Sequence, residues 1–338
     1  MKKLKIGIIG VGRLGYEHAC NIANRVPGSE LVAIADANFD RAKQVAEELG
    51  VTAVYNDPKA LCADPNVEAV AIITNTASHV EMIKIAMDAG KHVFCEKPLA
   101  DTVEKCKEAE AIIAAHPELT IMLGFMRRYD HSYQVAKKKM ENGDIGDVIL
   151  VRCYSQDPIS IIEGTLEYAP RSGGQFIDMS IHDFDLIRWL TGSEVKELWA
   201  TGGCYEFKQY KDWDDGDNVS GLMKMENDAM AFFFAGRAAA HGSHVETEIV
   251  GTRSTLRIAS VPTDSLVEVM SQHGVCRECY QDFITRWHDA YITEIEEFCD
   301  CIATGRKATP GVIDGTQSTK IAFRCKESFL TDKKLTLE

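Results

Sequence analysis

The chain has 338 residues, of which 45% are hydrophobic and 26% charged, and its formal net charge is −14 at pH 7. This length and composition predict about two globular domains and exclude a disordered chain or a small disulfide-stapled protein. The acidic balance disfavours a nucleic-acid partner, because such partners bind basic surfaces, but it leaves room for a local anion site built from backbone N–H groups.

The sequence lacks the signals of export and membrane insertion. The longest apolar run, Ala229–Ala235, falls far short of the roughly 20 residues that span a bilayer. The first nine residues imitate a signal peptide, but glycines interrupt the apolar stretch and no cleavage pattern follows. The eleven cysteines are odd in number and scattered, apart from Cys276-x-x-Cys279 and Cys299-x-Cys301. We therefore expect a reduced, cytoplasmic protein with no membrane partner.

The first part of the chain alternates strand and helix patterns, which predicts a parallel sheet with helices on both faces. The expected strands are Lys5–Ile9, Leu31–Ala35, Val70–Ile73, Val93–Cys95 and Thr120–Leu123. A first helix follows Gly15 to about Asn24, and the other expected helices are Arg41–Leu49, Val80–Asp88 and Val103–Ala115. We assign residues 1–126 to this α/β domain.

Beyond about Arg127, strands follow one another with few helices between them. This predicts a second, α+β domain over residues 127–338, built on an open and mostly antiparallel sheet. The expected strands are Val148–Cys153, Val195–Gly203, Ser220–Met225, Met230–Ala235, Thr247–Val250, Thr255–Ile258 and Leu266–Val269. The expected helices are Ser132–Met140, Phe176–Leu190, Tyr280–Thr304 and Asp314–Leu330.

A glycine pattern, Gly10-x-Gly12-x-x-Gly15, leaves the first strand and opens the first helix. Glycines there allow a tight turn and a close backbone approach to a pyrophosphate, which the helix N-terminus attracts. Asp36 ends the second strand, where a carboxylate accepts hydrogen bonds from adenine ribose hydroxyls and repels a 2′-phosphate. The pattern predicts a Rossmann dinucleotide-binding domain that prefers NAD to NADP, although Arg13 and Arg41 could weaken that preference. The plainer interpretation is a helix–strand turn beside a solvated aspartate.

Two further clusters carry candidate chemistry. Glu96-Lys97-Pro98 follows a buried strand directly, and strand carboxyl ends face the ligand crevice of a parallel sheet. On a continuous helix, Asp178, His182 and Asp185 fall within about 60° of arc, and apolar residues cover most of the rest. A buried helix carries charge only where the charge is paired or functional, which favours a histidine base positioned by a carboxylate. A surface lysine and a structural Asp–His pair are the plainer alternatives.

Five motifs together resemble one family over essentially the whole chain. They are Gly10-x-Gly-x-x-Gly15, Thr74-Asn-Thr-Ala-Ser-His79, Cys95-Glu-Lys-Pro98, Gly124-Phe-Met-Arg-Arg-Tyr-Asp130 and Ser172-Gly-Gly…Asp178…His182-Asp-x-Asp185. In this order they resemble the glucose–fructose oxidoreductase/inositol dehydrogenase/MocA family, and most closely its inositol 2-dehydrogenase branch. Asn75 departs from the proline that many members carry there, which bears on loop geometry near the cofactor.

The resemblance implies an NAD-dependent oxidoreductase that converts myo- or scyllo-inositol to the keto-inositol. Its implied catalytic residues are Lys97, Asp178 and His182, with His182 as the base. The cofactor contacts that we expect are Gly10, Gly12, Arg13, Leu14, Gly15, Asp36, Thr74, Asn75, His79, Glu96 and Lys97. The expected polyol contacts are Arg127, Ser155, Asp157, Asp178 and His182, with Tyr168 and Arg237 as weaker candidates.

Other functions stay open at this point. Oxidation of another sugar, such as an aldose or a deoxy-sugar, uses the same chemistry, and a non-catalytic dinucleotide sensor would keep the glycine loop alone. Zinc is disfavoured, because Cys276-x-x-Cys279 has no matching ligand pair and Lys97 would compete as a cation. The resemblance also implies a homo-oligomer, either a tetramer or a dimer.

Overall fold

The protein is described by a computed structural model over residues 2–259 and 263–337. The chain divides into two compact units. The first contains Met1–Tyr129 and His288–Thr319, and the second contains Asp130–Trp287 and Lys320–Glu338. The first change of unit lies close to the expected boundary at residue 126. Periodicity gave no sign that residues 288–319 rejoin the first unit.

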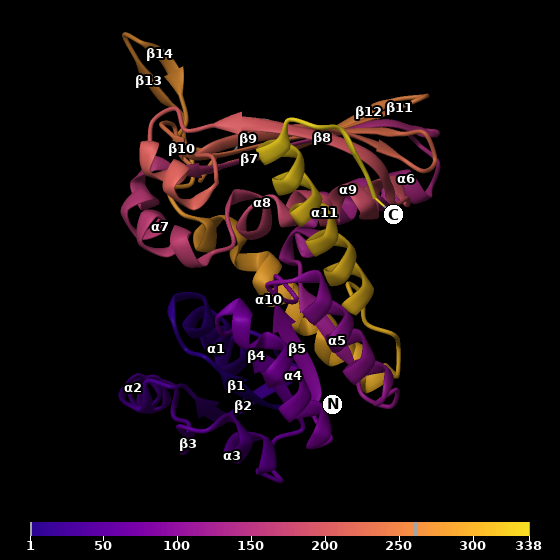
Figure 1. Cartoon of the computed structure of the whole chain (residues 1–338). Helices are drawn as coiled ribbons and strands as arrows, with labels where there is room; N and C mark the ends of the chain where they lie inside the picture. The colour runs from indigo at the N-terminus through magenta and orange to yellow at the C-terminus, as the bar shows by residue number, and fades with distance from the viewer. Residues whose placement is uncertain (1, 260–262, 338) are drawn as a thin grey trace. The chain divides into compact units, whose positions relative to one another are not determined.

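The first unit contains a six-stranded sheet in the order β3-β2-β1-β4-β5-β6, and its strand pairs are all parallel (Figure 1). The strands are β1 Leu4–Ile9, β2 Ser29–Ala35, β3 Ala53–Tyr55, β4 Ala69–Ile72, β5 His92–Glu96 and β6 Ile121–Gly124. The helices of this N-terminal part are α1 Arg13–Asn24, α2 Phe39–Leu49, α3 Pro58–Ala63, α4 His79–Asp88 and α5 Val103–Ala114, with short 3₁₀ turns η1 Thr76–Ser78 and η2 Met126–Tyr129. This is the strand order of a doubly wound dinucleotide-binding fold, so the expected Rossmann domain is confirmed.

Local sequence explains these elements. The last four residues of β1 and all of β4 are buried, as parallel strands covered on both faces must be. Helix α2 begins where the Asn38 side chain accepts a hydrogen bond from Arg41 N and ends at Gly50 in the left-handed region. The sheet order reverses between β1 and β4, and such a reversal opens a ligand crevice at the strand carboxyl ends.

The C-terminal helices α10 Phe283–Thr304 and α11 Val312–Thr331 are each divided between the units. Within the first unit, Ile295 and Phe298 of α10 belong to the same buried core as Ile6 and Phe94. The rings of Phe94 and Phe298 lie 6.0 Å apart. A segment far downstream in the sequence therefore completes the Rossmann core.

The second unit contains a seven-stranded sheet in the order β12-β11-β7-β10-β9-β8-β15. The β7–β10 pair is parallel and the others are antiparallel, which confirms the expected mostly antiparallel sheet. The strands are β7 Val148–Pro158, β8 Val195–Gly203, β9 Asn218–Met225, β10 Met230–Ala239, β11 His244–Gly251, β12 Thr255–Ile258 and β15 Leu335–Thr336. The helices are α6 His131–Glu141, α7 Ile162–Tyr168, α8 Gln175–Asp178 and α9 Ile181–Thr191, with 3₁₀ turns η3 Ile159–Ile161, η4 Ala169–Arg171 and η5 Lys208–Trp213.

Helices α6, α8 and α9 lie along one face of this sheet (Figure 1). Phe233 of β10 packs edge-on against Phe184 of α9, with ring centroids 5.0 Å apart, and Phe176 of α8 lies 6.1 Å away. Buried and exposed side chains alternate along the strands, and Trp199 of β8 and Leu222 of β9 are exposed between buried neighbours. The alternation is that of a sheet with one covered face.

Two expected elements differ from the structure. The single helix expected over Phe176–Leu190 is wrong, because α8 ends at Asp178 and α9 begins at Ile181. The strand expected over Leu266–Val269 is also wrong, because the extended segment there is β13 Val269–Ser271, paired with β14 Gly274–Cys276. In the described part of the chain, no helix is both long and apolar enough to cross a membrane.

Candidate active site

The glycine loop between β1 and α1 leaves open space where a dinucleotide phosphate would bind. Gly10 has a φ of 93°, and a Cβ on Gly15 would collide with the Gly10 carbonyl oxygen, so both positions need glycine. A Cβ on Gly12 would meet nothing within 4 Å. Gly12 also begins α1 without a side-chain cap, and the N–H groups of the first turn of a helix attract an anion. The loop therefore fits the pyrophosphate of NAD.

Asp36 ties the second strand to this loop. Its Oδ2 accepts a hydrogen bond from Val11 N at 2.8 Å, and its Oδ1 accepts one from Asn38 N at 2.8 Å. Arg41 Nε donates to Val11 O at 3.2 Å, so a guanidinium lies at the same loop. Arg13 is the first residue of α1 and is exposed. Both arginines that could weaken a preference for NAD thus belong to the loop region, with Arg41 in direct contact with it.

The Thr74–His79 stretch follows β4. Asn75 is exposed at the start of η1, and its φ of −70° is one that proline shares, so the departure from the family pattern needs no change in the φ of this residue. His79 is buried, with Nδ1 2.8 Å from Pro98 O and Nε2 3.2 Å from Thr74 O. Burial lowers the pKa of His79, whose ring lies between the turns that follow β4 and β5.

Glu96 and Lys97 stand at the carboxyl end of β5. Lys97 is half-buried, whereas the Glu96 side chain turns inward and is buried. Glu96 Oε2 accepts a hydrogen bond from Lys97 N at 3.1 Å, and Oε1 lies 2.9 Å from His18 Nε2. A Cβ on Gly124 of β6 would lie 2.8 Å from the Glu96 carboxylate, so glycine makes room for it. The expected cofactor contact of Glu96 stays a prediction.

In the second unit, Arg237 joins two of the expected site residues. Its guanidinium forms ion pairs with Asp157 at 2.7 Å and with Asp178 at 2.6 Å. Burial opposes the charge of Arg237, but the two carboxylates outweigh it and raise the pKa of the guanidinium. The pKa of Tyr168 is raised to about 12, first by desolvation and then by the negative charge of Asp178. The weaker sequence candidates therefore lie in the same cluster as Asp178.

His182 and Ser155 are placed near the first turn of α9. His182 is the second residue of that helix and is 6% exposed. Ser155 of β7 is fully buried, and its hydroxyl donates a hydrogen bond to Asp183 Oδ1 at 2.8 Å. The pairing ties β7 to α9 directly beside His182. Arg127 lies in the first unit, buried in η2. The polyol contacts expected of Ser155 and Arg127 stay predictions.

The Ser172-Gly-Gly motif shapes the start of α8. Gly173 and Gly174 have φ values of 83° and 96°, which side-chain-bearing residues rarely adopt. The turn directs Gln175 N to Asp215 Oδ2, which accepts its hydrogen bond at 2.8 Å. Burial raises the pKa of Asp215. Sequence reasoning missed Asp215, although the glycine pair signalled a constrained turn just before Asp178.

Comparison with known families identifies the chain. Residues 4–125 match the model of an oxidoreductase family with an NAD-binding Rossmann fold, and residues 133–257 match the C-terminal domain of the GFO/IDH/MocA proteins. The chain belongs to the GFO/IDH/MocA oxidoreductase family. It is an NAD-dependent oxidoreductase, as the family resemblance of its motifs implied.

Similar proteins cover nearly the whole chain. The scyllo-inositol 2-dehydrogenase (NAD(+)) of Bacillus subtilis is 32% identical over 97% of this chain and 94% of its own length. The crystal structure of scyllo-inositol dehydrogenase from Lactobacillus casei, with bound NAD(H) and scyllo-inositol, is 39% identical with a TM-score of 0.96 and covers 99% of both chains. The myo-inositol 2-dehydrogenase structure from Lactobacillus plantarum is 37% identical, with a TM-score of 0.96 over 100% of both chains.

Proposed function

We propose that this protein oxidises a cyclic polyol, an inositol, to the corresponding keto-inositol with NAD. The observation that carries the proposal is the likeness, over 99% of the chain, to a Lactobacillus casei enzyme that binds both NAD(H) and scyllo-inositol. The likeness to a myo-inositol 2-dehydrogenase is nearly as strong, so the proposal includes both isomers.

The proposed chemistry assigns three residues to one hydroxyl group. Bound NAD accepts the hydride, and the hydroxyl proton must leave the oxygen at the same time. We assign proton removal to His182. Asp178 stabilises the imidazolium that results, and its carboxylate is held in place by the ion pair with Arg237. Lys97 donates a hydrogen bond to the hydroxyl oxygen and stabilises the developing negative charge.

Polyol recognition needs donors and acceptors for vicinal hydroxyls, and Arg237 with Asp157 supplies both. The two side chains are joined at 2.7 Å, which fixes their orientation. Asp157 keeps part of its side chain exposed, whereas Ser155 is buried against Asp183. We therefore propose Arg127, Asp157 and Arg237 as polyol contacts, and a supporting role for Ser155 through Asp183.

An NAD-reduction assay tests the substrate class. The panel contains myo-inositol, scyllo-inositol, glucose, xylose and the 6-phosphates of the two sugars. We expect NADH formation with at least one inositol at a kcat/KM about tenfold or more above that with any sugar. A higher kcat/KM with an aldose would replace the proposed substrate by that sugar. No NADH formation with any compound, from protein that binds NADH, would favour a dinucleotide sensor.

The residue roles are tested by Lys97→Ala and His182→Ala. Each is expected to lower kcat by about 10²–10⁴-fold while NADH affinity, measured by fluorescence titration, stays within a factor of about three. Because both groups act on one hydroxyl, the double variant should lose less than the product of the single losses. A near-normal kcat for His182→Ala would remove it from the mechanism.

We also propose that the protein is a cytoplasmic homo-oligomer, a dimer or a tetramer. Its eleven cysteines are odd in number and scattered along the chain, as is usual in a reducing compartment. The uncovered face of the second-unit sheet carries exposed apolar side chains, among them Trp199, Leu222 and Met230. Light scattering coupled to size-exclusion chromatography tests the oligomer, and a monomer at micromolar concentration would contradict it.

A further inference from the structure

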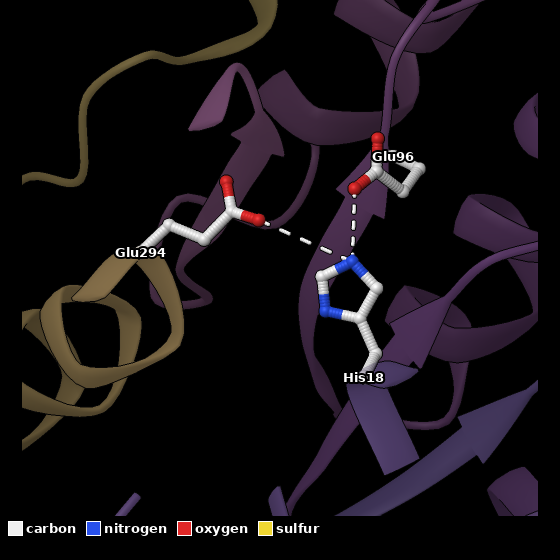
Figure 2. A group of neighbouring side chains, drawn as sticks. All are labelled: His18, Glu96 and Glu294. Atoms are coloured by element: carbon white, nitrogen blue, oxygen red, sulfur yellow. Dashed lines mark hydrogen bonds and ion pairs between the residues drawn. The ribbon is translucent and has the colours of Figure 1, made fainter. Parts of the chain in front are cut away.

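A cluster of three buried polar side chains in the first unit contacts the Lys97 backbone through Glu96. His18 of α1, Glu96 of β5 and Glu294 of α10 meet there (Figure 2). His18 Nε2 lies 2.9 Å from Glu96 Oε1 and 4.0 Å from Glu294 Oε1. The side chains of His18 and Glu294 are fully buried, and that of Glu96 is 5% exposed. Such burial of a carboxylate is costly unless its hydrogen bonds are satisfied.

The two carboxyl groups of this cluster differ in their surroundings. Burial and the negative charge of Glu96 raise the pKa of Glu294 well above its usual value, which favours the protonated form of Glu294. Neither of its oxygens has a hydrogen-bond partner among the described residues. Glu96, in contrast, accepts bonds through both oxygens, from His18 Nε2 and from Lys97 N.

The tautomer of His18 follows from the same contacts. Its Nδ1 is buried and has no hydrogen-bond partner in the described part of the chain. A proton on Nδ1 would leave a buried donor unsatisfied, which costs about 1–3 kcal/mol, so Nε2 is the ring nitrogen that donates. The ring is held in this orientation by Phe94, 5.5 Å away, and by Tyr291, which meets it edge-on at 5.3 Å. His18 is thus a donor of fixed orientation that points at Glu96.

We propose that His18 is a positioning residue that holds the Glu96 carboxylate against the Lys97 N–H and thereby fixes the backbone from which the Lys97 side chain extends. The chain of contacts is continuous, from His18 Nε2 through the Glu96 carboxylate to Lys97 N. Gly124 leaves room for this carboxylate where any other residue would displace it. The effect on turnover, unlike the effect on the backbone, rests on the proposed function.

A divalent cation bound by the same three side chains is disfavoured by the state of the donors. The ligand atoms lie within 4.8 Å of one another, which a metal site also requires. However, coordination through His18 Nε2 would move the ring proton to Nδ1, where metal-bound histidines normally have an acceptor and this one has none among the described residues. It would also require Glu294 to lose the proton that burial favours.

The experiment compares His18→Asn with His18→Gln, and uses His92→Gln as the control. The glutamine amide reaches about as far as Nε2 and can still donate to Glu96, whereas the asparagine amide is too short. His92 lies at the other end of the same strand and accepts a hydrogen bond from Thr120 N, away from Glu96. The primary readout is the hydrogen-exchange rate of the Lys97 amide by NMR, which needs no substrate.

We expect His18→Asn to raise exchange at the Lys97 amide at least tenfold, and His18→Gln and His92→Gln to change it less than threefold. On the proposed substrate, His18→Asn should lower kcat about tenfold with little change in the KM for NAD. Unchanged exchange in a folded His18→Asn variant would overturn the proposal. So would a stoichiometric divalent metal in the purified protein that His18→Asn removes. Altered exchange in a protein that oxidises no inositol would uphold the positioning role and refute the proposed function.

Discussion

We propose that Asp36 is the residue that discriminates between NAD and NADP. Its carboxylate is held by two backbone N–H groups, one of them from the glycine loop, and it therefore has a fixed direction. A fixed carboxylate favours ribose hydroxyls and repels a 2′-phosphate. Arg41, which contacts the same loop, is the residue best placed to receive such a phosphate once the carboxylate is removed.

We predict that Asp36→Ala lowers the ratio of kcat/KM for NAD to that for NADP by about 10- to 100-fold, because a hydrogen bond to a charged group contributes about 1.5–3 kcal/mol. Asp40→Ala is the matched control, since Asp40 pairs with Lys43 on the exposed face of α2. Steady-state kinetics with both cofactors measure the ratio. An unchanged ratio in Asp36→Ala would assign cofactor choice to other residues.

The raised pKa of Glu294 predicts that the free energy of unfolding depends on pH. Its pKa is raised in the folded protein above the usual 4.5, so the folded state keeps the proton over a pH range in which the unfolded chain releases it. The contribution of Glu294 to stability is therefore full below about pH 4.5 and is lost as pH rises toward the folded pKa. Glu294→Gln does not titrate. The difference in unfolding free energy between this variant and the wild type, measured by denaturant titration, should increase in favour of the variant as the pH rises above about 4.5. A constant difference would contradict a protonated Glu294.

At the level of elements, the turn before α8 sets the direction of Asp178. Gly174 has a φ of 96° and a ψ of 173°, a combination that is almost restricted to glycine. A Cβ on Gly174 would also lie 3.1 Å from Asp215 Oδ2, the acceptor that caps the start of α8. The break between α8 and α9 separates Asp178 from the helix of His182, so each side chain is positioned by its own element.

Gly174→Ala is expected to destabilise the protein by about 1–3 kcal/mol, the cost of one strained residue. Gly164→Ala provides the control, because Gly164 lies in α7, a Cβ added there would meet nothing within 4 Å, and the variant is expected to gain up to about 1 kcal/mol. Thermal and denaturant unfolding measure both. Equal stability of the two variants would show that the turn tolerates a side chain.

Strong hydrophobic periodicity made most elements predictable. The buried runs at Leu4–Ile9 and Ala69–Ile72 and the helix that ends at Gly50 carry clear local signals. The three-residue strand β3 and the six-residue helix α3 are too short for a period to emerge, and neither was predicted. The break at Met179 could not be predicted either, because the apolar residues from Ile177 to Leu190 keep helical spacing across it.

For the molecule as a whole, the motifs predicted the family and the Rossmann sheet. Contacts between residues far apart in the sequence could not be predicted. The cluster of His18, Glu96 and Glu294 joins three elements from opposite ends of the sequence, and no local pattern links them. The return of residues 288–319 to the first unit has the same cause, since an amphipathic helix does not reveal which core it completes. Arg237 was a weak candidate for this reason, because its partners lie 80 and 59 positions away.

Isotope transfer is the sharpest test of inositol oxidation by this protein. Scyllo-inositol has six equivalent carbons, so a sample deuterated at every carbon reports oxidation at any position. We predict that the protein converts NAD and this substrate to keto-inositol and NADH bearing one deuterium, seen by mass spectrometry, and that His182→Ala makes neither at a comparable rate. Myo-inositol deuterated in the same way gives the second arm. NADH without deuterium, or no oxidation of either isomer by protein that binds NADH, would contradict hydride transfer from an inositol.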